Sequence, residues 1–551
     1  MTGRNTRPPM NSEYDIVVIG GGINGVAIAR ECARAGRSVL LVEKNDFGSG
    51  TTSRTTRIVH GGLRYLEHGE LSLVRESLRE RGRLMRERPH LVRPLKFVFA
   101  LNENSRHSAL QLRAGLWLYR QLSRTRARNG HTADVLAELE RRLDSGQRWA
   151  LFQYDDAQCE YPERLVAEWL VEALHAGATA RNHTEVLEVR TSDGRVQGVR
   201  VRDLLSGVEQ FVRADWVVNA TGPWADHVYA ASGLQQARPM VGGVRGSHIV
   251  VPTFEGAPST ALYSEASDGR PVFVIPWNGQ VLIGTTEVED RRNPDLCRPA
   301  PAEIQYLLRA VHRLYPRARL TTADITYAFA GIRALPYTDT RNTAGITRRH
   351  VIRNHAEEGA MGFLSVIGGK LTTAAEVARQ TARKVGVRCP EPQNVWVATG
   401  SASGIESTFG QWSQMVSLAT GITEQAARAV AIWHGRCALP IAQMAGTDER
   451  FRRPICEHTD HIVAEAVSAV RYEHAVTLGD MLLRRVPVAL SGCFGQDCAE
   501  LAAERIGRAL GWDARQIVRE LDAFYAERES FLVNVERPDR FRAPELGESA
   551  A

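Results

Sequence analysis

Lysine is scarce in this sequence. The chain of 551 residues has only four lysines, Lys44, Lys96, Lys370 and Lys384, and takes the rest of its basic charge from arginine. The net charge is only +6, so we attribute the arginines to base composition and expect no nucleic-acid partner. The scarcity also makes Lys370, which follows two glycines, a stronger site candidate than any single arginine.

Metal-binding cysteine patterns are missing as well. None of the eight cysteines belongs to a Cys-x-x-Cys pair, and the spacing of Cys493 and Cys498 does not suit a usual zinc or iron–sulfur site. We therefore expect no metal and no fused iron–sulfur module. Reduced thiols in a cytosolic protein are the expectation.

The sequence has no long apolar run of the length that spans a bilayer. Residues 1–13 are polar and lack the apolar centre of a signal peptide. We expect a cytoplasmic protein that is neither secreted nor membrane-spanning. With 43% apolar and 24% charged residues, the chain is long enough for two to four folded domains.

A glycine-rich turn near the start of the chain predicts a nucleotide site. A short apolar run enters Gly20-Gly-Gly-Ile-Asn-Gly25, and a segment with helical spacing follows. Gly20 allows the turn, Gly22 lets backbone amides approach a pyrophosphate, and Gly25 lets the helix pack closely with its N-terminus facing the anion. The next strand ends at Glu43, whose carboxylate can bind adenosine ribose hydroxyls and disfavours NADP.

Three further patterns place strands beside glycine turns. Residues 186–189 and 196–201 flank the turn Ser192-Asp-Gly194 and predict a hairpin. Residues 216–222 and 362–373 each indicate a strand that enters a glycine-containing turn. Repeated junctions of this kind predict several loops at one edge of an open α/β sheet, where ligands bind.

The pattern as a whole predicts an α/β fold with an added α region. A Rossmann-type nucleotide-binding domain, an antiparallel-sheet substrate domain and a C-terminal helical domain are expected. We expect the discontinuous nucleotide-binding domain in residues 14–95, 150–230 and 331–388, the substrate or cap domain in 96–149 and 231–330, a linker in 390–407, and the helical domain in 405–535.

Together these motifs resemble the FAD-dependent glycerol-3-phosphate dehydrogenase family, within the D-amino-acid oxidase-like fold group. The resemblance covers nearly the whole chain and implies bound FAD, with oxidation of sn-glycerol 3-phosphate to dihydroxyacetone phosphate by hydride transfer. It rests on Gly20-Gly-Gly-Ile-Asn-Gly25, Ile58-Val-His-Gly-Gly-Leu-Arg-Tyr-Leu-Glu67, Asn219-Ala-Thr-Gly-Pro-Trp224, Arg245-Gly-Ser-His248, Phe273-Val-Ile-Pro-Trp277, Ile283-Gly-Thr-Thr286, Gly331-Ile-Arg333, Gly368-Gly-Lys-Leu-Thr-Thr373 and Thr477-Leu-Gly-Asp-Met-Leu-Leu-Arg-Arg485.

The resemblance also implies the site residues. His248 is the candidate base because imidazole titrates near working pH, and Arg333 would stabilise the developing alkoxide, with the final acceptor of the proton left open. The implied substrate-binding residues, whose cations suit a phosphate, are Arg64, Tyr65, Arg333, Arg348 and Lys370. The implied FAD-binding residues are Gly20, Gly22, Asn24, Gly25, Glu43, Thr51, Thr52, Ser53, His60, Gly61, Gly62, Val186, Thr221, Gly222, Gly369, Lys370 and Leu371.

Several of these residues have two interpretations. His60 is either a hydrogen-bonding support under the flavin or a catalyst, and Tyr65 either contacts phosphate or packs. Thr51, Thr52 and Ser53 either hydrogen-bond FAD or are ordinary polar loop residues.

The chain departs from the family pattern at five positions. Arg57 and Arg245 stand where lysine is usual, and Ala334 stands where proline is usual. Ala374 and Ala375 replace a Tyr-Arg pair, which removes an aromatic ring and a cation expected near the flavin edge. The reaction class is unaffected by these changes.

The electron acceptor is open between a membrane quinone, which we favour, and oxygen. Residues 71–128 carry arginines among Phe97, Phe99, Leu116, Trp117 and Tyr119, which predicts either a basic amphipathic surface for anionic lipid or ordinary solvent-facing helices. Peripheral contact with the inner face of the cytoplasmic membrane is therefore an alternative location.

A function without turnover is the third alternative. The chain would then bind FAD and a phosphorylated ligand as a sensor or scaffold. The C-terminal helical domain is the candidate surface for a partner or for a homodimer.

Overall fold

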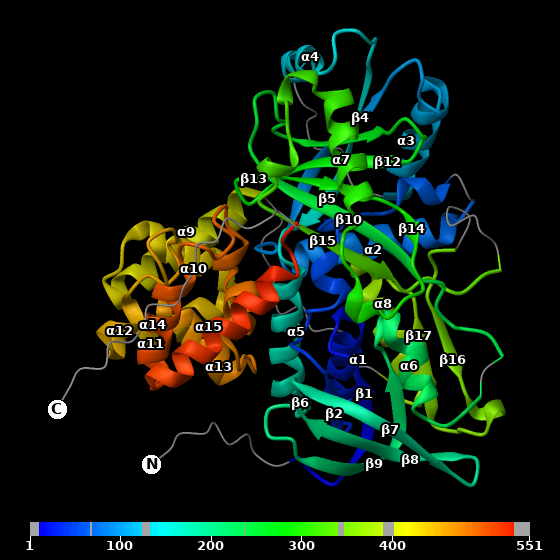
Figure 1. Cartoon of the computed structure of the whole chain (residues 1–551), viewed down its shortest axis with the longest axis vertical. Helices are drawn as coiled ribbons and strands as arrows, with labels where there is room; N and C mark the ends of the chain where they lie inside the picture. The colour runs from blue at the N-terminus through cyan, green and yellow to red at the C-terminus, as the bar shows by residue number, and fades with distance from the viewer. Residues whose placement is uncertain are drawn as a thin grey trace.

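The structure is a computed structural model that describes residues 10–66, 69–123, 133–235, 237–339, 347–388 and 402–533. Figure 1 shows two sheets stacked along the long axis, with a helical region beside them. The predicted linker at 390–407 lies mostly outside the described residues. The sheets and the helical region agree with the predicted fold class, whereas the exact domain boundaries stay a prediction.

The first sheet has a parallel centre. Along the order β16-β17-β9-β1-β2-β6, the neighbouring strands pair in parallel except β16 with β17, and the antiparallel hairpin of β7 and β8 joins the sheet through an antiparallel pairing of β8 with β9. The central strands are continuous apolar runs because both faces of the sheet are covered. Their bounds are β1 Glu13–Ile19, β2 Val39–Val42, β6 Thr179–Arg181, β9 Glu209–Asn219, β16 Val351–Asn354 and β17 Phe363–Ile367.

Helices cover one face of this sheet, and a hairpin with a short helix covers the other. The predicted turn joins β7 to β8, with Asp193 and Gly194 at φ 53° and 74°, as a two-residue hairpin turn requires. The helical layer is α1 Ile23–Arg34, α5 Pro162–His175 and α8 Ala374–Lys384, and the opposite layer is β7 Thr184–Ser192, β8 Arg195–Asp203 and α6 Ala225–Ala230.

The central strands end level with one another. Ile19 of β1 is in register with Val42 of β2 and with Asn219 of β9. The loops after these strands therefore meet at one edge, as predicted from the glycine junctions.

The second sheet is largely antiparallel. It has nine strands in the order β14-β10-β13-β12-β11-β4-β5-β3, with β15 paired to β10, and only β11 and β4 pair in parallel. Asn278 and Gly279, both with positive φ, close the β12–β13 hairpin. The bounds are β3 Ile58–Val59, β4 Val92–Leu101, β5 Ala150–Cys159, β10 Val244–Pro252, β11 Ala261–Glu265, β12 Pro271–Trp277, β13 Gln280–Gly284, β14 Val288–Glu289 and β15 Tyr327–Arg333.

Among the described residues, the helices that flank the second sheet are α2, α3 and α7, and α4 lies at the end of the sheet. The amphipathic α7 packs its apolar side on the outer face of the sheet. These helices are α2 Leu71–Glu87, α3 Ala109–Ser123, α4 Ala133–Arg142 and α7 Pro301–Leu314.

The aromatic residues of the stretch 71–128 mostly face inward, which corrects the expectation of a surface made by the whole stretch. Phe97, Phe99 and Tyr119 are buried in the core between β4, α3 and the neighbouring strands. In the described part of this stretch, the exposed large apolar side chains are Leu110 (76%) and Trp117 (64%) on the outer face of α3, and Leu71 (42%) at the start of α2. Among the described residues, no helix has both the length and the apolarity to cross a membrane.

The C-terminal region is helical, as predicted. A short π-helix, η11 (Asp480–Arg485), lies between its longer helices and packs against α5 of the first sheet. The α-helices described in this region are α9 Ala402–Thr420, α10 Glu424–His434, α11 Ala438–Thr447, α12 Glu449–Arg452, α13 Val463–Tyr472, α14 Ala499–Leu510 and α15 Ala514–Glu529.

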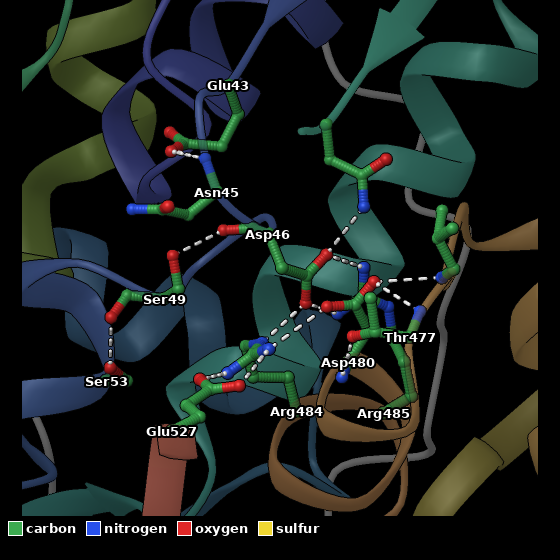
Figure 2. Close-up of polar contacts among 12 residues, drawn as sticks. Glu43, Asn45, Asp46, Ser49, Ser53, Thr477, Asp480, Arg484, Arg485 and Glu527 are labelled. Carbon is green, nitrogen blue, oxygen red and sulfur yellow. Dashed lines mark hydrogen bonds and ion pairs between the residues drawn. The ribbon is translucent and has the colours of Figure 1, made fainter. Parts of the chain in front are cut away.

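A buried carboxylate joins this helical region to the first sheet (Figure 2). Asp46, in the turn after β2, accepts hydrogen bonds from Arg484 Nε at 2.5 Å and from both terminal nitrogens of Arg485 at 2.8 Å. Asn182 Nδ2 adds a fourth bond at 3.0 Å. The Asp46 side chain has no exposed surface. Both arginines of the predicted C-terminal signature therefore bind one carboxylate on the nucleotide side.

Further charges surround this centre. Arg484 also binds Glu527 at 2.5 Å and Asp480 at 3.1 Å, and Asp480 accepts backbone hydrogen bonds from residues 476 and 477. Arg485 donates to the backbone oxygen of Glu473, whose carboxylate is held by both terminal nitrogens of Arg164 on α5. The acidic and basic groups alternate, so each buried charge has an opposite neighbour.

We predict that Arg485→Met lowers the free energy of unfolding by about 3–5 kcal/mol, because it leaves a buried carboxylate short of its partner. Denaturant unfolding of the full chain measures this. The matched control is Arg508→Met, which breaks an exposed pair with Glu504 and should cost less than about 1 kcal/mol. Equal unfolding midpoints for the two variants would contradict the prediction.

Candidate functional site

A cavity of about 1270 Å³ lies at the carboxyl edge of the first sheet and extends along the second. The loops after β1, β2, β9 and β17 line it on one side, and residues of β4, β10, β12 and β15 line it on the other. The cavity therefore lies where the strand register brings the loops together, with the second sheet as its far wall.

The glycine-rich turn has the geometry that its sequence predicts. Gly20 has φ +103°, and a side chain there would meet the backbone oxygen of Ala220 at 2.8 Å. A Cβ on Gly25 would lie 1.8 Å from the backbone oxygen of Gly20, so only glycine allows α1 to start this close to the strand. A Cβ on Gly22 would meet nothing nearer than Thr52 Oγ1 at 3.3 Å, so this backbone is open to the cavity.

Glu43 follows directly after β2 and contacts the glycine-rich turn. Its carboxylate accepts hydrogen bonds from the backbone nitrogens of Gly21 at 2.7 Å and Asn45 at 2.9 Å, and it lines the cavity. Burial raises the pKa of Glu43, and the two backbone donors act against that rise. The acidic group is thus positioned beside the glycine turn, where a ribose hydroxyl can reach it.

Asn24 crosses to the loop after β17. Its Nδ2 donates to the backbone oxygen of Gly368 at 3.2 Å. A Cβ on the next residue, Gly369, would lie only 2.7 Å from that nitrogen, so this position suits glycine. The Asn24 Oδ1 atom is buried and has no hydrogen-bond partner among the described residues. An unsatisfied buried acceptor on a cavity wall indicates a missing ligand donor, and it fits the FAD expected here.

The turn at His60, Gly61 and Gly62 is held from behind. The backbone nitrogen of Gly61 donates to Tyr119 Oη at 2.8 Å and to Asp156 Oδ1 at 3.2 Å, and a Cβ on Gly61 would lie 2.4 Å from Tyr119 Oη. His60 lines the cavity, and burial lowers its pKa to about 3. His60 is therefore uncharged at neutral pH.

The hydroxyls of Thr51, Thr52 and Ser53, which follow the Gly48–Gly50 turn, make different hydrogen bonds. Thr51 Oγ1 donates to the backbone oxygen of Ile332 at 3.0 Å, and Thr52 Oγ1 accepts from the backbone nitrogen of Ile23 at 3.1 Å. Both threonines line the cavity. Ser53 is buried and donates to the backbone oxygens of Ser49 and Gly50, so its hydroxyl is used inside the turn.

His248 and Arg333 project from adjacent strands of the second sheet. His248 Nε2 is 2.8 Å from Thr56 Oγ1, and its ring stacks on Phe329. Burial, followed by the charge of Arg333, lowers the pKa of His248 to about 3. The premise that this imidazole titrates near working pH is therefore wrong, because burial disfavours its charged form.

Arg333 itself is oriented by the Ile283–Thr286 motif. One terminal nitrogen of Arg333 donates to Thr285 Oγ1 at 3.0 Å, and the backbone oxygen of Thr286 lies 3.4 Å away. Gly246 makes room for it, since a Cβ there would lie 2.5 Å from the guanidinium.

The cations Lys370 and Arg348 lie on the side of the first sheet. Lys370 Nζ donates to Ser77 Oγ at 3.0 Å and lies 4.2 Å from the centre of the Tyr65 ring. Burial lowers the pKa of Lys370 to about 7. Arg348 lines the same cavity and pairs with Glu287 at 2.6 Å. The side chain of Arg64 lies outside the described part of the structure.

Most of the predicted residues meet in this one cavity. Gly25, Ser53, Gly61 and Gly62 do not line it and instead shape the turns behind it. Those that line it are Gly20, Gly22, Asn24, Glu43, Thr51, Thr52, His60, Tyr65, Val186, Thr221, Gly222, His248, Arg333, Arg348, Gly369, Lys370 and Leu371. Their individual roles stay predictions.

The departures from the family pattern are explained mostly by packing. Arg57 binds both oxygens of Glu163 at 3.0 Å, and Arg245 binds Asp290 and Glu303, so both arginine forks serve buried ion pairs outside the cavity. Ala374 and Ala375 are buried at the start of α8 and do not line the cavity, whereas Ala334 does.

Sequence reasoning missed Arg54 and the partners of the catalytic candidates. Arg54 lines the cavity, and its guanidinium carbon lies 3.6 Å from the centre of the Phe531 ring. Burial lowers its pKa to about 9, which leaves it charged at neutral pH. Thr285 was inside a recognised motif and could have been found, whereas Arg54 and Thr56 had no distinctive sequence signal.

Comparison with known proteins shows the family to which the chain is similar. The family described as "FAD dependent oxidoreductase" matches residues 15–410, and the one described as "C-terminal domain of alpha-glycerophosphate oxidase" matches residues 366–517. A glycerol-3-phosphate dehydrogenase of Synechocystis is 35% identical over 95% of this chain and 97% of its own length. A D-erythritol 1-phosphate dehydrogenase of Brucella abortus is 35% identical over 71% of this chain and 77% of its own.

A solved structure shows the same fold over nearly the whole chain. It is the glycerol-3-phosphate dehydrogenase from Bacillus halodurans complexed with FAD, with a TM-score of 0.74 and 23% identity. The alignment covers 96% of this chain and 97% of that one.

We predict that Gly25→Ala yields protein that has lost most of its bound FAD, because the added Cβ would force α1 away from the turn. The ratio of flavin to protein absorbance after purification measures this. Gly410→Ala on α9, where a Cβ would have no neighbour within 4 Å, is the control and should keep its FAD. Full FAD content in Gly25→Ala would refute the close-packing argument.

Proposed function

The chain belongs to the FAD-dependent glycerol-3-phosphate dehydrogenase family, and on this premise we propose that it oxidises sn-glycerol 3-phosphate to dihydroxyacetone phosphate. The bound FAD would accept the hydride from the substrate carbon. A single observation carries the proposal. Two groups of cations, Lys370 with Arg348 and Arg333 beside His248, line one cavity together with the glycine turn.

The first group suits the phosphate of the substrate. Lys370 offers a compact charge, and Arg348 offers a planar fork whose present partner is Glu287. The Tyr65 ring, stacked against the Lys370 ammonium, holds it toward this part of the cavity. The phosphate dianion would bind Arg348 either in place of the Glu287 carboxylate or beside it.

The second group suits the reacting hydroxyl. Arg333 is held by Thr285 and the Thr286 carbonyl, so its charge is already in place to stabilise an alkoxide. His248 is uncharged because of its burial, but its low pKa makes the imidazole a weak base, so the group that finally takes the proton stays open. Thr56, hydrogen-bonded to His248 Nε2, orients the ring and links it to the cavity wall.

A quinone is the proposed electron acceptor. Five aromatic side chains of the second sheet also line the cavity: Phe97, Phe99, Tyr154, Tyr263 and Phe273. Such a lining suits a flat apolar molecule. Residues of α3 line the cavity as well.

The outer face of α3 supports peripheral membrane contact. It exposes Leu110 and Trp117 near Arg113 and Arg120, and such a combination favours an anionic lipid surface. Oxygen remains the alternative acceptor, because the C-terminal match is to a domain described from an oxidase.

We predict that sn-glycerol 3-phosphate bleaches the flavin band of the purified protein in the absence of oxygen, whereas glycerol without phosphate does not at the same concentration. D-erythritol 1-phosphate tests the longer phosphorylated polyol. A flavin that stays oxidised with glycerol 3-phosphate would contradict the proposal and favour a sensor or scaffold. After reduction, a soluble quinone should reoxidise the flavin faster than air does, and the reverse order would favour the oxidase.

We also predict a pH effect on KM that belongs to Lys370. Its pKa is lowered to about 7, so it is charged below that pH and loses its charge above it. Because the substrate phosphate, with a second pKa of about 6, stays a dianion between pH 7 and 9, KM should rise by up to about tenfold per pH unit in that range.

Lys370→Arg is the matched variant for this effect. Arginine keeps its charge at these pH values, so the rise in KM should be largely abolished. Steady-state kinetics at several pH values provide the measurement. The same slope in both proteins would remove Lys370 from phosphate binding.

A further inference from the structure

Three cysteines from two segments of the C-terminal helical region come together. Cys493 and Cys498 lie on either side of a tight turn before α14, and their Sγ atoms are 3.8 Å apart, which is hydrogen-bond distance for sulfur. Cys456, from the loop between α12 and α13, is buried and lies close enough to Cys498 to influence its pKa. Nothing in the proposed oxidation of glycerol 3-phosphate uses these thiols.

The surroundings of Cys493 favour its thiolate. Cys493 Sγ lies 3.4 Å from Ser491 Oγ, and the backbone groups of Gly495 and Asp497 in the same turn lower the pKa of this thiol. The turn leads directly into the N-terminus of α14, whose dipole favours negative charge. The hydrogen bond between the Cys493 and Cys498 sulfurs, followed by these smaller contributions, lowers the pKa of Cys493 to about 5.

Cys493 is more exposed to solvent than the other two cysteines. Cys493 is half-buried, whereas Cys456 and Cys498 are each only 1% exposed. A solvent-borne oxidant therefore meets Cys493 first, with the Cys498 thiol directly behind it. This is the arrangement of an attacking thiol and a resolving thiol.

We propose that Cys493 and Cys498 form a thiol modification site that a hydroperoxide oxidises reversibly to a disulfide. The Cys493 thiolate attacks one peroxide oxygen, the O–O bond breaks, and the departing hydroxide takes a proton to become water. The sulfur of Cys498 then attacks the Cys493 sulfenic acid, the S–O bond breaks, and a second water leaves. Two thiols lose two electrons and two protons in total, and hydrogen peroxide is reduced to two waters.

The turn between Cys493 and Cys498 packs against the second sheet. Phe494, between the two positions of the bond, stacks on Tyr327 of β15 with ring centres 4.1 Å apart, and β15 ends in Arg333. The backbone oxygen of Leu490, just before the turn, accepts from Asn278 and Gln280 of the second sheet. The disulfide would therefore form where the helical region contacts the strand that carries Arg333.

A metal site is the competing interpretation of a three-thiol cluster. Among the residues that the structure describes, no group of three or more His, Cys, Asp or Glu side chains is arranged to hold a metal ion. The Cys493 and Cys498 sulfurs are hydrogen-bonded to each other instead, and such contact favours thiol exchange.

The test uses the reduced full-length holoprotein, treated with one equivalent of hydrogen peroxide, quenched with N-ethylmaleimide, and mapped as peptides without reductant. We expect the peptide that contains Cys493 and Cys498 to be lighter by two hydrogen atoms and unlabelled, and dithiothreitol to restore both thiols. Cys297, half-buried but with its pKa raised to about 11 by burial, serves as the internal control and should remain a labelled thiol.

Two serine variants make the result specific. Cys498→Ser should stop at a Cys493 sulfenic acid that dimedone traps, and Cys493→Ser should leave Cys498 reduced. Cys456→Ser should still form the disulfide. Unchanged melting temperatures verify that the variants are folded.

Three results would overturn the proposal. Cys493 could remain a thiol after peroxide, it could be oxidised to sulfinic acid without a disulfide, or the reduced wild-type protein could retain one zinc ion that protects all three thiols. Because disulfide mapping needs no substrate turnover, failure here is distinguishable from failure of the proposed dehydrogenase activity.

Discussion

The structure depends on the contact between one carboxylate and two arginines. Asp46 stands three residues after Glu43 and three before Ser49, in the loop that bounds the cavity, and it is held by Arg484 and Arg485 from the far end of the chain. A buried charge of this kind is stable only when its partners are present. The helical region is thereby joined to the loop that presents the FAD-binding groups, and the two are expected to lose stability together.

With this loop in place, the site results from two sheets that share one cavity. The parallel sheet supplies backbone turns and the Lys370 side, while the antiparallel sheet supplies His248 and Arg333. Burial disfavours the charged form of the titratable group on both sides. It keeps His248 neutral, and it lowers the pKa of Lys370 to about 7, so that a bound phosphate would favour the charged amine.

Local signals in the sequence were sufficient for much of this account. The glycine turn, the Asp193–Gly194 hairpin and the C-terminal helices follow from spacing and turn chemistry within a few residues, and the structure confirms them. Contacts between remote segments had no such signal: the support of Lys370 by Ser77, the Thr56 contact of His248, and the binding of Asp46 by Arg485 all arise from tertiary packing. The error about His248 has the same origin, because burial sets its pKa and no local pattern reports burial.

The central claim is that phosphate and reacting hydroxyl are bound by different groups of cations in one cavity. An experimental structure of the protein with FAD and sn-glycerol 3-phosphate tests it most directly. The account predicts phosphate oxygens within hydrogen-bond distance of Lys370 Nζ and the Arg348 guanidinium, with the substrate hydroxyls toward Arg333. A phosphate bound instead at Arg54, or a substrate bound among the aromatic side chains of Phe97, Phe99 and Tyr263, would contradict it.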